Sequence, residues 1–327
     1  MPIPSDLSPV RVGVIGLGRR GMHHLERFRL RSDIIAVAAH DADANRAPLA
    51  EAFGIRFHRK PKDVLEDPEV DAVLVATPPR RHRSVVCDAV AAGKHVLVER
   101  PLSDAPRDAA RMIAAAGEAG RMLAVLQPRR FDGDFRTARE TLRSGSLGEL
   151  KKARLAVLGL EIPPRSNVPA DPHESLGVLL NRGADYLDQL VDLDSSRPRR
   201  IFARVGSLDP ATGRERAFTA FVDFESGVEA HLEVDLDHPA ELRTGWTLTG
   251  TAGSYRKFRH YTIAADGEVI DVPLDPLPDE PDRIYDELVA HLRVGEPLAV
   301  SPERAQTVVA LLDAARRSAK QGRPIPL

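Results

Sequence analysis

Short apolar runs alternate with segments of helical periodicity through the first 126 residues of the chain. The runs are rich in valine and isoleucine, which is typical of parallel strands covered on both faces. We expect strands at residues 10–15, 34–39, 55–57, 70–76, 95–98 and 122–126. We expect helices at residues 19–31, 43–53, 61–66, 81–92 and 104–119. This alternation predicts an α/β fold with a doubly wound parallel sheet and right-handed crossovers.

The pattern changes near residue 128, and runs with a period of two dominate from residue 199 to residue 272. We expect helices at residues 131–143, 176–191, 280–292 and 302–319, and strands at residues 150–160, 201–205, 217–224, 228–234, 244–249, 255–261 and 269–272. A proline-rich stretch at residues 163–174, which contains His173, is expected to be a loop. The alternating strands predict an antiparallel sheet with one buried face. We therefore expect two domains, residues 1–128 and 129–327.

A glycine-rich turn follows the first expected strand and opens the first expected helix. Gly16 allows a tight turn, Gly18 lets a pyrophosphate approach the backbone, and Gly21 lets helix and strand pack closely. Leu17 and Arg19 fill positions between these glycines. The N–H groups and the positive dipole end of the helix would face the phosphates. The turn therefore predicts a dinucleotide site.

An acidic residue at the end of the second expected strand strengthens this interpretation. Asp41 lies about 20 residues past Gly21, where an acid binds the ribose hydroxyls of NAD. A carboxylate there would repel a 2′-phosphate, so NAD is expected rather than NADP. The alternative is an ordinary βα turn followed by a surface aspartate.

Composition excludes several other classes of protein. The 327 residues are 43% hydrophobic, 29% charged and 5% aromatic, with a net charge of −2 and a pI near 6.6. This balance offers no basic surface for nucleic acid, and no apolar run is long enough to cross a membrane. Cys87 is the only cysteine, so we expect no internal disulfide and no thiolate metal site. No metal is expected, and without a visible secretion signal the expected location is cytoplasmic.

Several further motifs follow in a fixed order. They are Asp41-x-Asp43-x-x-Arg46-Ala47, Ala76-Thr77-Pro78-x-x-x-His82, the block from Ala92 to Leu102 with Glu99-Arg100-Pro101, Arg129-Arg130-Phe131 and Ser144-Gly145-x-x-Gly148. By these motifs and their order, the chain resembles the glucose-fructose oxidoreductase, inositol dehydrogenase and rhizopine catabolism superfamily. The resemblance covers nearly the whole chain.

The resemblance implies an N-terminal Rossmann domain and a C-terminal α/β domain with an open antiparallel sheet, through which relatives often form homodimers or homotetramers. Relatives usually oxidise or reduce a hydroxyl of a small sugar, cyclitol or polyol with NAD(P). By position, the three glycines would hold the pyrophosphate and Asp41 the adenosine ribose. Thr77, Pro78 and His82 would line the cofactor side of the cleft, and Glu99 would lie near the nicotinamide ribose.

The chain departs from the family pattern at the reacting centre. Family members usually carry lysine where Arg100 stands, and their helix motif Asp-x-Gly-x-His-x-x-Asp here has Asn181, Asp185 and Asp188 at its polar positions. Arginine stays protonated, so Arg100 can orient a hydroxyl or polarise a carbonyl but cannot act as a base. Asp185 could accept a proton if a dry cleft raised its pKa. By position, Asn181 joins Arg100 and Asp185 as a catalytic candidate, with Arg130 and Asp188 as candidate substrate ligands.

Three functions follow as hypotheses. The first is an NAD-dependent oxidoreductase acting on a sugar-like or polyol substrate. The second is a dinucleotide-binding sensor or partner subunit without turnover, since lysine and histidine are both replaced. The third is NAD-assisted glycoside cleavage. For the helix itself, the alternative is a solvated acidic face, because Asp185, Asp188 and Asp192 recur at helical spacing. Vicinal His23 and His24 are expected at the surface or in a cap.

Overall fold

The computed structural model describes residues 8–159, 176–210, 212–239, 243–264 and 266–327. The predicted loop at residues 163–174, with His173, lies outside these residues. The described chain divides into two compact units. The first contains the residues up to Gln127 and Asp282–Val309, and the second contains the described residues of 128–281 and Ala310–Leu327.

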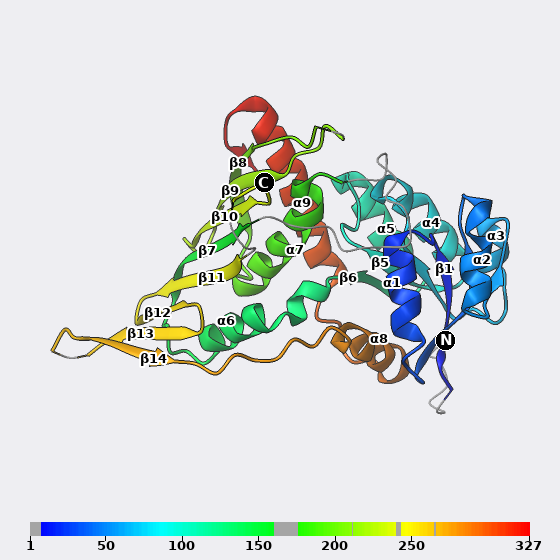
Figure 1. Ribbon diagram of the computed structural model, residues 1–327, viewed down its shortest axis with the longest axis horizontal. Helices are drawn as coiled ribbons and strands as arrows, with labels where there is room; N and C mark the ends of the chain where they lie inside the picture. Colours follow the sequence, from blue (N-terminus) through cyan, green and yellow to red (C-terminus); the bar gives the residue numbers. More distant parts are fainter. Residues whose placement is uncertain (1–7, 160–175, 211, 240–242, 265) are drawn as a thin grey trace. The chain divides into compact units, whose positions relative to one another are not determined.

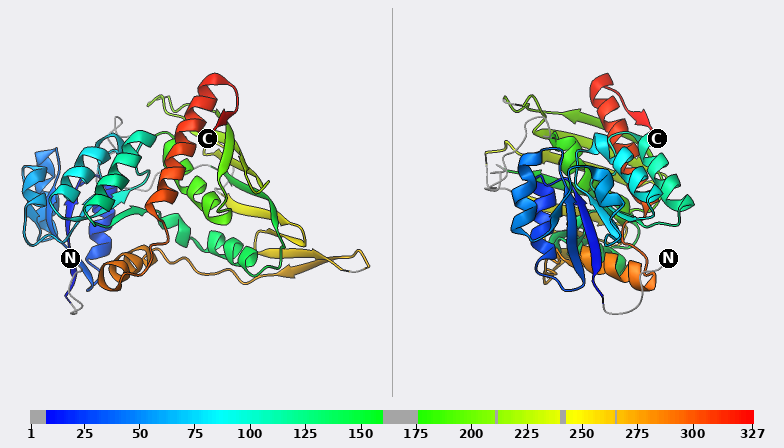
Figure 2. Two further views of the ribbon diagram at one scale, coloured as in Figure 1. Left: turned by 180° about the vertical axis from the view of Figure 1, so that it is seen from behind. Right: turned by 90° about the vertical axis from the view of Figure 1, so that its right-hand side faces the viewer.

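The first unit is built on a six-stranded parallel sheet in the order β3-β2-β1-β4-β5-β6 (Figures 1 and 2). Its strands are β1 (Val10–Ile15), β2 (Ile34–His40), β3 (Arg56–Phe57), β4 (Ala72–Val75), β5 (His95–Glu99) and β6 (Leu123–Leu126). Its helices are α1 (Arg19–Phe28), η1 (Ala44–Arg46), α2 (Ala47–Ala52), α3 (Pro61–Leu65), α4 (Pro79–Ala91), α5 (Pro106–Glu118) and α8 (Arg283–Val294). The predicted doubly wound α/β fold is confirmed.

Burial on both faces of this sheet explains the mainly apolar runs of the sequence. Val12 and Val14 of β1 and Val73 and Leu74 of β4 are all 0% exposed. Burying each such side chain contributes roughly 1.5–3 kcal/mol to stability. The strand order reverses between β1 and β4, and the carboxyl ends of strands at such a switch point are where ligands bind in open α/β sheets.

The second unit is built on a nine-stranded sheet in the order β14-β13-β12-β11-β7-β10-β9-β8-β15. Its strands are β7 (Leu150–Leu158), β8 (Pro198–Val205), β9 (Ala217–Phe224), β10 (Glu229–Asp235), β11 (Arg243–Gly250), β12 (Gly253–Arg256), β13 (Arg259–Ile263), β14 (Val269–Pro273) and β15 (Ile325–Pro326). Helical elements η2 (Pro128–Phe131), α6 (Gly133–Arg143) and α7 (Val178–Leu193) accompany it, together with the part of α9 (Pro302–Gln321) from Ala310 onward. The sheet is antiparallel as predicted, except that β7 and β10 pair in parallel.

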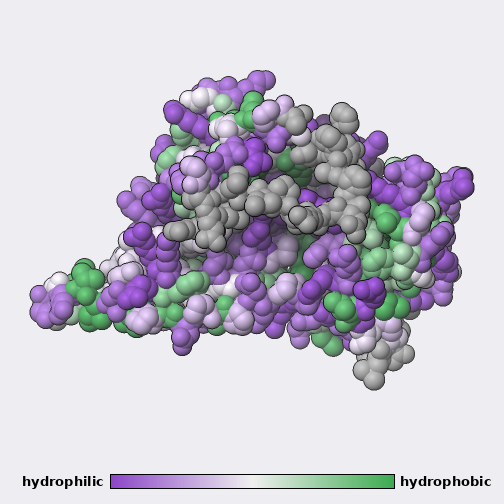
Figure 3. All heavy atoms as spheres, in the orientation of Figure 1, coloured by the Kyte–Doolittle hydropathy of each residue, from purple (hydrophilic) through white to green (hydrophobic). Residues whose placement is uncertain are grey.

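The two faces of this sheet differ as the period-two pattern predicts. Leu155, Val222 and Leu232 are 0% exposed on the face that packs against helices, whereas Phe221 on the other face is 47% exposed. The β13–β14 hairpin also carries exposed apolar side chains, such as Ile263 at 72%. Figure 3 shows apolar atoms among hydrophilic ones near the free end of this hairpin.

One predicted strand is wrong. The segment 255–261 is not one strand but the inner part of the hairpin β12–β13, in which Arg256 pairs with Arg259. The two residues between them, Lys257 and Phe258, have φ values of 48° and 61°. Such two-residue turns favour asparagine and glycine, and neither occurs here, so no turn signal interrupts the alternation. Among the described helices, none is both long and apolar enough to cross a membrane.

Candidate functional site

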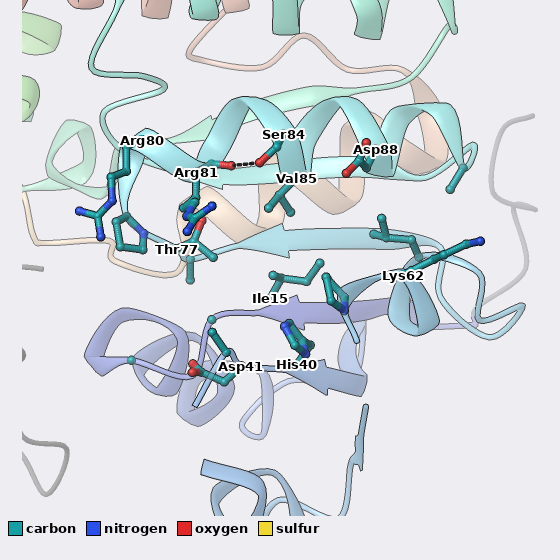
Figure 4. Close-up of a pocket in the computed structure, with 18 of the residues that line it drawn as sticks. Ile15, His40, Asp41, Lys62, Thr77, Arg80, Arg81, Ser84, Val85 and Asp88 are labelled. Carbon is teal, nitrogen blue, oxygen red and sulfur yellow. Dashed lines mark hydrogen bonds between the residues drawn. The ribbon is translucent and has the colours of Figure 1, made fainter. Parts of the chain in front are cut away.

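A pocket of about 730 Å³ opens at the carboxyl ends of β1, β2 and β4, in the first unit. Gly16, Gly18, Asp41, Thr77 and Pro78 are among its lining residues. Figure 4 shows Asp41, Thr77, Arg80 and Arg81 toward one end of the pocket and Lys62 and Asp88 toward the other. The pocket therefore brings together residues that the sequence predicted for a dinucleotide site.

The glycines at Gly16 and Gly21 are required by the backbone itself. Gly16 has a φ of +104°, and a Cβ there would lie 2.6 Å from the carbonyl oxygen of Ala76. A Cβ on Gly21 would lie 1.9 Å from the carbonyl oxygen of Gly16. The turn and α1 thus pack backbone against backbone. The N–H groups of the first turn of a helix have no partners within the helix, so this end of α1 suits an anion.

Asp41 is 9% exposed and holds the glycine-rich turn in place. Its Oδ2 accepts hydrogen bonds from the Leu17 amide at 2.6 Å and from Arg46 Nη1 at 3.1 Å, and its Oδ1 accepts one from the Asp43 amide at 2.8 Å. An ionised carboxylate has about four acceptor positions, so capacity remains for a ribose hydroxyl. Leu17 is 0% exposed and its amide donates a hydrogen bond to Asp41. Its contribution to the site is therefore structural.

Thr77 presents a buried hydroxyl for which no hydrogen-bond partner exists among the described residues. An unsatisfied buried hydroxyl is costly, and a bound ligand that pairs with it removes that cost. Together with the glycine turn and Asp41, this hydroxyl makes the pocket fit a dinucleotide. Arg19 at the start of α1 is exposed, and Pro78 is half-buried as the N-cap of α4.

His82 does not line this pocket. It is 0% exposed, and its ring nitrogens contact the carbonyl oxygens of Thr77 at 2.7 Å and Leu102 at 3.1 Å. Burial lowers the pKa of His82, with the two carbonyl contacts opposing that shift. His82 therefore fastens the Thr77 loop to the segment after β5.

Glu99, at the end of β5, lies in a buried network that the sequence did not reveal. Arg20 Nη1 lies 2.6 Å from Glu99 Oε2, and His24 Nε2 lies 2.8 Å from Glu99 Oε1. His24 is 5% exposed and also contacts Tyr285. The expectation that His24 lies at the surface or in a cap is therefore wrong, although His23 is exposed as expected. Arg100, the next residue, is 8% exposed.

Asp185 lies in α7, in the second unit. Its side chain is 0% exposed, and Arg129 Nε lies 3.4 Å from its Oδ2. Arg129 Nη1 also contacts Asp132 Oδ2 at 2.9 Å, and the guanidinium lies over the ring of Tyr186 at 5.8 Å. One arginine thus joins two carboxylates.

Asp132 is a candidate that sequence reasoning missed. Burial raises its pKa to about 6, with Arg129 opposing the shift and Asp134 and Asp185 adding to it. A carboxylate that titrates near neutrality is suited to exchange a proton. The only signal in the sequence is its place immediately after Arg129-Arg130-Phe131.

Arg130 and Asp188 form a second, fully buried cluster, each 1% exposed. Arg130 donates two hydrogen bonds to Asp188, at 2.5 and 2.9 Å, and its Nη1 lies 2.9 Å from Asp192 Oδ1. These contacts do not support direct substrate binding by Arg130 or Asp188. They also exclude a solvated acidic face on α7, although Asn181 at its beginning is half-buried.

No group of three or more histidine, cysteine, aspartate or glutamate side chains within the described ranges could hold a metal ion. Cys87 is a half-buried free thiol, and burial raises its pKa.

Two family profiles match this chain. The profile described as oxidoreductase family, NAD-binding Rossmann fold, matches residues 10–127. The profile of the GFO/IDH/MocA C-terminal domain matches residues 135–256. The chain belongs to the Gfo/Idh/MocA oxidoreductase family.

Two dehydrogenases of known reaction are similar to this family member over part of their lengths. Myo-inositol 2-dehydrogenase of Thermotoga maritima is 34% identical over 191 residues, covering 58% of this chain and 54% of that enzyme. The 1-carboxy-3-chloro-3,4-dihydroxycyclohexa-1,5-diene dehydrogenase of Comamonas testosteroni is 30% identical over 226 residues, covering 68% and 57%. The matches thus span little more than half of each enzyme.

The fold also matches over its whole length. The crystal structure of GenD2 from gentamicin A biosynthesis, in complex with NAD, has a TM-score of 0.82 and 24% identity, and covers 100% of this chain and 99% of that one. The structural match confirms the fold, and the family profiles confirm the Gfo/Idh/MocA resemblance and show that the protein is an NAD-binding oxidoreductase.

Proposed function

We propose that this oxidoreductase transfers a hydride between NAD and a hydroxyl or carbonyl carbon of a sugar-like or polyol substrate. The observation that supports NAD use most directly is the pocket in which Asp41, the glycine turn and the Thr77 hydroxyl meet. The cyclic polyhydroxy compounds named for the two dehydrogenases support the substrate class. When bound, the nicotinamide supplies the hydride acceptor or donor.

Residues 1–128 supply the NAD-binding domain in this proposal. Gly16, Gly18 and the first turn of α1, which includes Arg19 and Gly21, hold the pyrophosphate, because these backbone N–H groups face an anion at a helix N-terminus. Asp41 binds the adenosine ribose and disfavours a 2′-phosphate. Thr77 and Pro78 border the cofactor. Three buried residues have a supporting role and do not contact the cofactor themselves. They hold the backbone that makes these contacts, and they are His82, Leu17 and Glu99.

Residues 129–327 supply the substrate domain, except that the structure groups Asp282–Val309 with the first unit. Arg100, from the NAD-binding domain, stays positively charged and stabilises the oxygen on which negative charge develops. Asp185 takes the hydroxyl proton, with Asn181 orienting the same hydroxyl. Asp132 contacts the same arginine, Arg129, and its pKa is raised to about 6, so we assign it as a second candidate proton acceptor beside Asp185. Arg130 and Asp188 are assigned to fixing α7 rather than to the substrate.

The test compares NAD binding with turnover. Calorimetry should show saturable NAD binding, weaker NADP binding, and NADH formation with at least one member of a panel of cyclitols, sugars and sugar acids. Arg100→Ala and Asp185→Asn should each lower kcat about 100-fold or more with the NAD affinity retained, because they remove charge at the reacting centre. Arg214→Ala, at an exposed arginine of the second unit, is the control.

The other outcomes identify the two competing functions. Tight NAD binding without turnover on any panel member would favour a sensor or partner subunit. The replacement of the family's lysine by Arg100 and of its histidine by Asp185 supports that alternative. Release of sugar from a glycoside without net NADH would favour NAD-assisted cleavage.

We also propose that two or four copies associate through the open face of the second-unit sheet. The cytoplasmic location stays a prediction.

A further inference from the structure

Four side chains from three separate parts of the chain meet at the end of β5 in the first unit. Arg20 and His24 come from α1, Glu99 ends β5, and Tyr285 comes from α8. His24, Glu99 and Tyr285 are 5%, 6% and 2% exposed. Figures 1 and 2 show α1 and α8 beside each other. The ring centroids of Phe28 in α1 and Tyr285 in α8 lie 5.4 Å apart.

The hydrogen-bond directions in this network follow from the charge of Glu99. Burial alone would raise the pKa of Glu99, but Arg20, His24 and Arg100 outweigh it and hold that pKa well below its usual range. An ionised carboxylate only accepts, so His24 Nε2 donates to Glu99 Oε1 at 2.8 Å. In a neutral ring Nδ1 then accepts from the Tyr285 hydroxyl at 2.7 Å. Burial raises the pKa of Tyr285, so that hydroxyl keeps its proton.

The other partners of Glu99 connect it to both halves of the site. Arg20 is the second residue of α1, between Gly18 and Gly21 of the pyrophosphate turn, and its Nη1 donates to Glu99 Oε2 at 2.6 Å. The backbone N–H of Arg100 donates to the same oxygen at 3.2 Å. One carboxylate therefore holds the turn that faces the phosphates and the chain that carries the proposed oxyanion-stabilising residue.

We propose that His24 and Tyr285 are positioning residues that orient the Glu99 carboxylate so that it fixes the pyrophosphate turn and the Arg100 backbone relative to each other. This inference rests on the proposed function of Arg100 and the turn. A proton relay through the same atoms is disfavoured, because a carboxylate held ionised is a poor carrier of protons near neutral pH.

Histidine suits this position because it donates on one side and accepts on the other. A buried carboxylate that loses one donor is left with part of its charge uncompensated. Glu99 should then turn toward solvent or toward Arg20 alone, which loosens the first turn of α1. The consequence is weaker NAD binding, although neither His24 nor Tyr285 is proposed to touch NAD.

The experiment uses the 327-residue protein and four variants: His24→Ala, His24→Gln, Tyr285→Phe and His23→Gln. Calorimetry gives the Kd for NAD at a temperature where each variant is fully folded. Hydrogen–deuterium exchange without NAD reports on residues 16–21 and 98–101. His24→Ala should raise the Kd for NAD about tenfold or more, since a hydrogen bond to a buried charge is lost. Exchange should become faster in both segments.

The remaining variants separate positioning from packing. Glutamine can donate to Glu99 and accept from Tyr285, so His24→Gln should bind NAD within about threefold of the parent protein. Tyr285→Phe, which removes only the hydroxyl, should fall between the parent and His24→Ala. His23→Gln, at the exposed neighbouring histidine, should match the parent.

Three results would count as failures, and they are distinguishable. If folded His24→Ala binds NAD with parent affinity and both segments exchange at the parent rate, the positioning role is overturned. If glutamine fails to rescue while alanine is impaired, His24 acts by packing, which also overturns it. If the parent protein itself binds no NAD, the proposed function fails, and the exchange data still decide whether the network orders the two segments.

Discussion

At the scale of single residues, the second unit holds a carboxylate whose surroundings disfavour its charge. Burial, Asp134 and Asp185 raise the pKa of Asp132 to about 6 in the folded protein, despite Arg129. In the unfolded chain an aspartate titrates near 3.9. Between these two pH values the folded protein keeps a proton that the unfolded chain releases. The free energy of unfolding should therefore fall as the pH rises from about 4 to about 6.

Asp132→Asn removes this titration and should flatten that part of the pH profile. Urea unfolding of parent and variant at pH 4.5, 5.5 and 7 measures the difference. The variant should gain stability relative to the parent as the pH rises, and then remain at a constant difference above pH 7. Asp266→Asn, in an exposed turn, should follow the parent. Equal slopes for parent and Asp132→Asn would show that Asp132 titrates normally.

Residue identity could be predicted where it depends on local spacing. Asp41 was predicted from its distance to the glycine turn, and the structure places it against that turn. The buried position of His24 could not be predicted in this way, because its partner Tyr285 lies 261 residues away in sequence. For the same reason Arg130 and Asp188, 58 residues apart, were interpreted as substrate ligands rather than as partners of each other. Long-range pairing of charges leaves no local periodicity.

At the scale of elements, the glycine turn shows how strictly a strand–turn–helix connection can depend on one atom. The Cβ position of Gly21 lies 1.9 Å from the Gly16 carbonyl oxygen, so any side chain must push α1 away from β1. Gly117 in α5 is different, because nothing lies within 4 Å of its Cβ position. Its backbone is helical, so alanine fits there without strain.

Gly21→Ala and Gly117→Ala therefore make a matched pair. Gly21→Ala should destabilise the protein by about 1–3 kcal/mol through backbone displacement, and should weaken NAD binding at least tenfold. Gly117→Ala should stabilise it by roughly 0.5–1 kcal/mol, because glycine loses more backbone entropy in a helix. Chemical unfolding and calorimetry measure both effects. Parent-like NAD binding by Gly21→Ala would refute the close packing of this turn.

Most elements follow from hydrophobic periodicity, and the exceptions have a common cause. The parallel strands β1, β4 and β5 are short, mainly apolar runs, so their positions could be predicted. The β12–β13 hairpin could not, because Lys257 and Phe258 adopt positive φ without a turn-forming residue. Pairing of β7 with β10 in parallel depends on tertiary topology, which the period-two pattern does not encode.

At the scale of the whole molecule, the open face of the second-unit sheet is the surface through which we propose that copies associate. Phe221 is 47% exposed, and its ring stacks on His231 with the ring centroids 4.4 Å apart and the planes 2° apart. On the next strand Arg204 lies over the Phe202 ring at 5.3 Å. Aromatic residues and arginine are enriched in the energetically important parts of protein interfaces. This face therefore supports the proposed association of two or four copies.

Phe221→Glu tests that association. A charge in the middle of an apolar contact should weaken self-association by about 2 kcal/mol or more, which is roughly thirtyfold in the dissociation constant. Sedimentation velocity at micromolar concentration should show an oligomer for the parent and mainly monomer for Phe221→Glu. Leu30→Glu places the same charge at a residue that is 73% exposed in the first unit, and it should leave the oligomer intact. A monomeric parent would refute the association, and an oligomeric Phe221→Glu would move the interface to another surface.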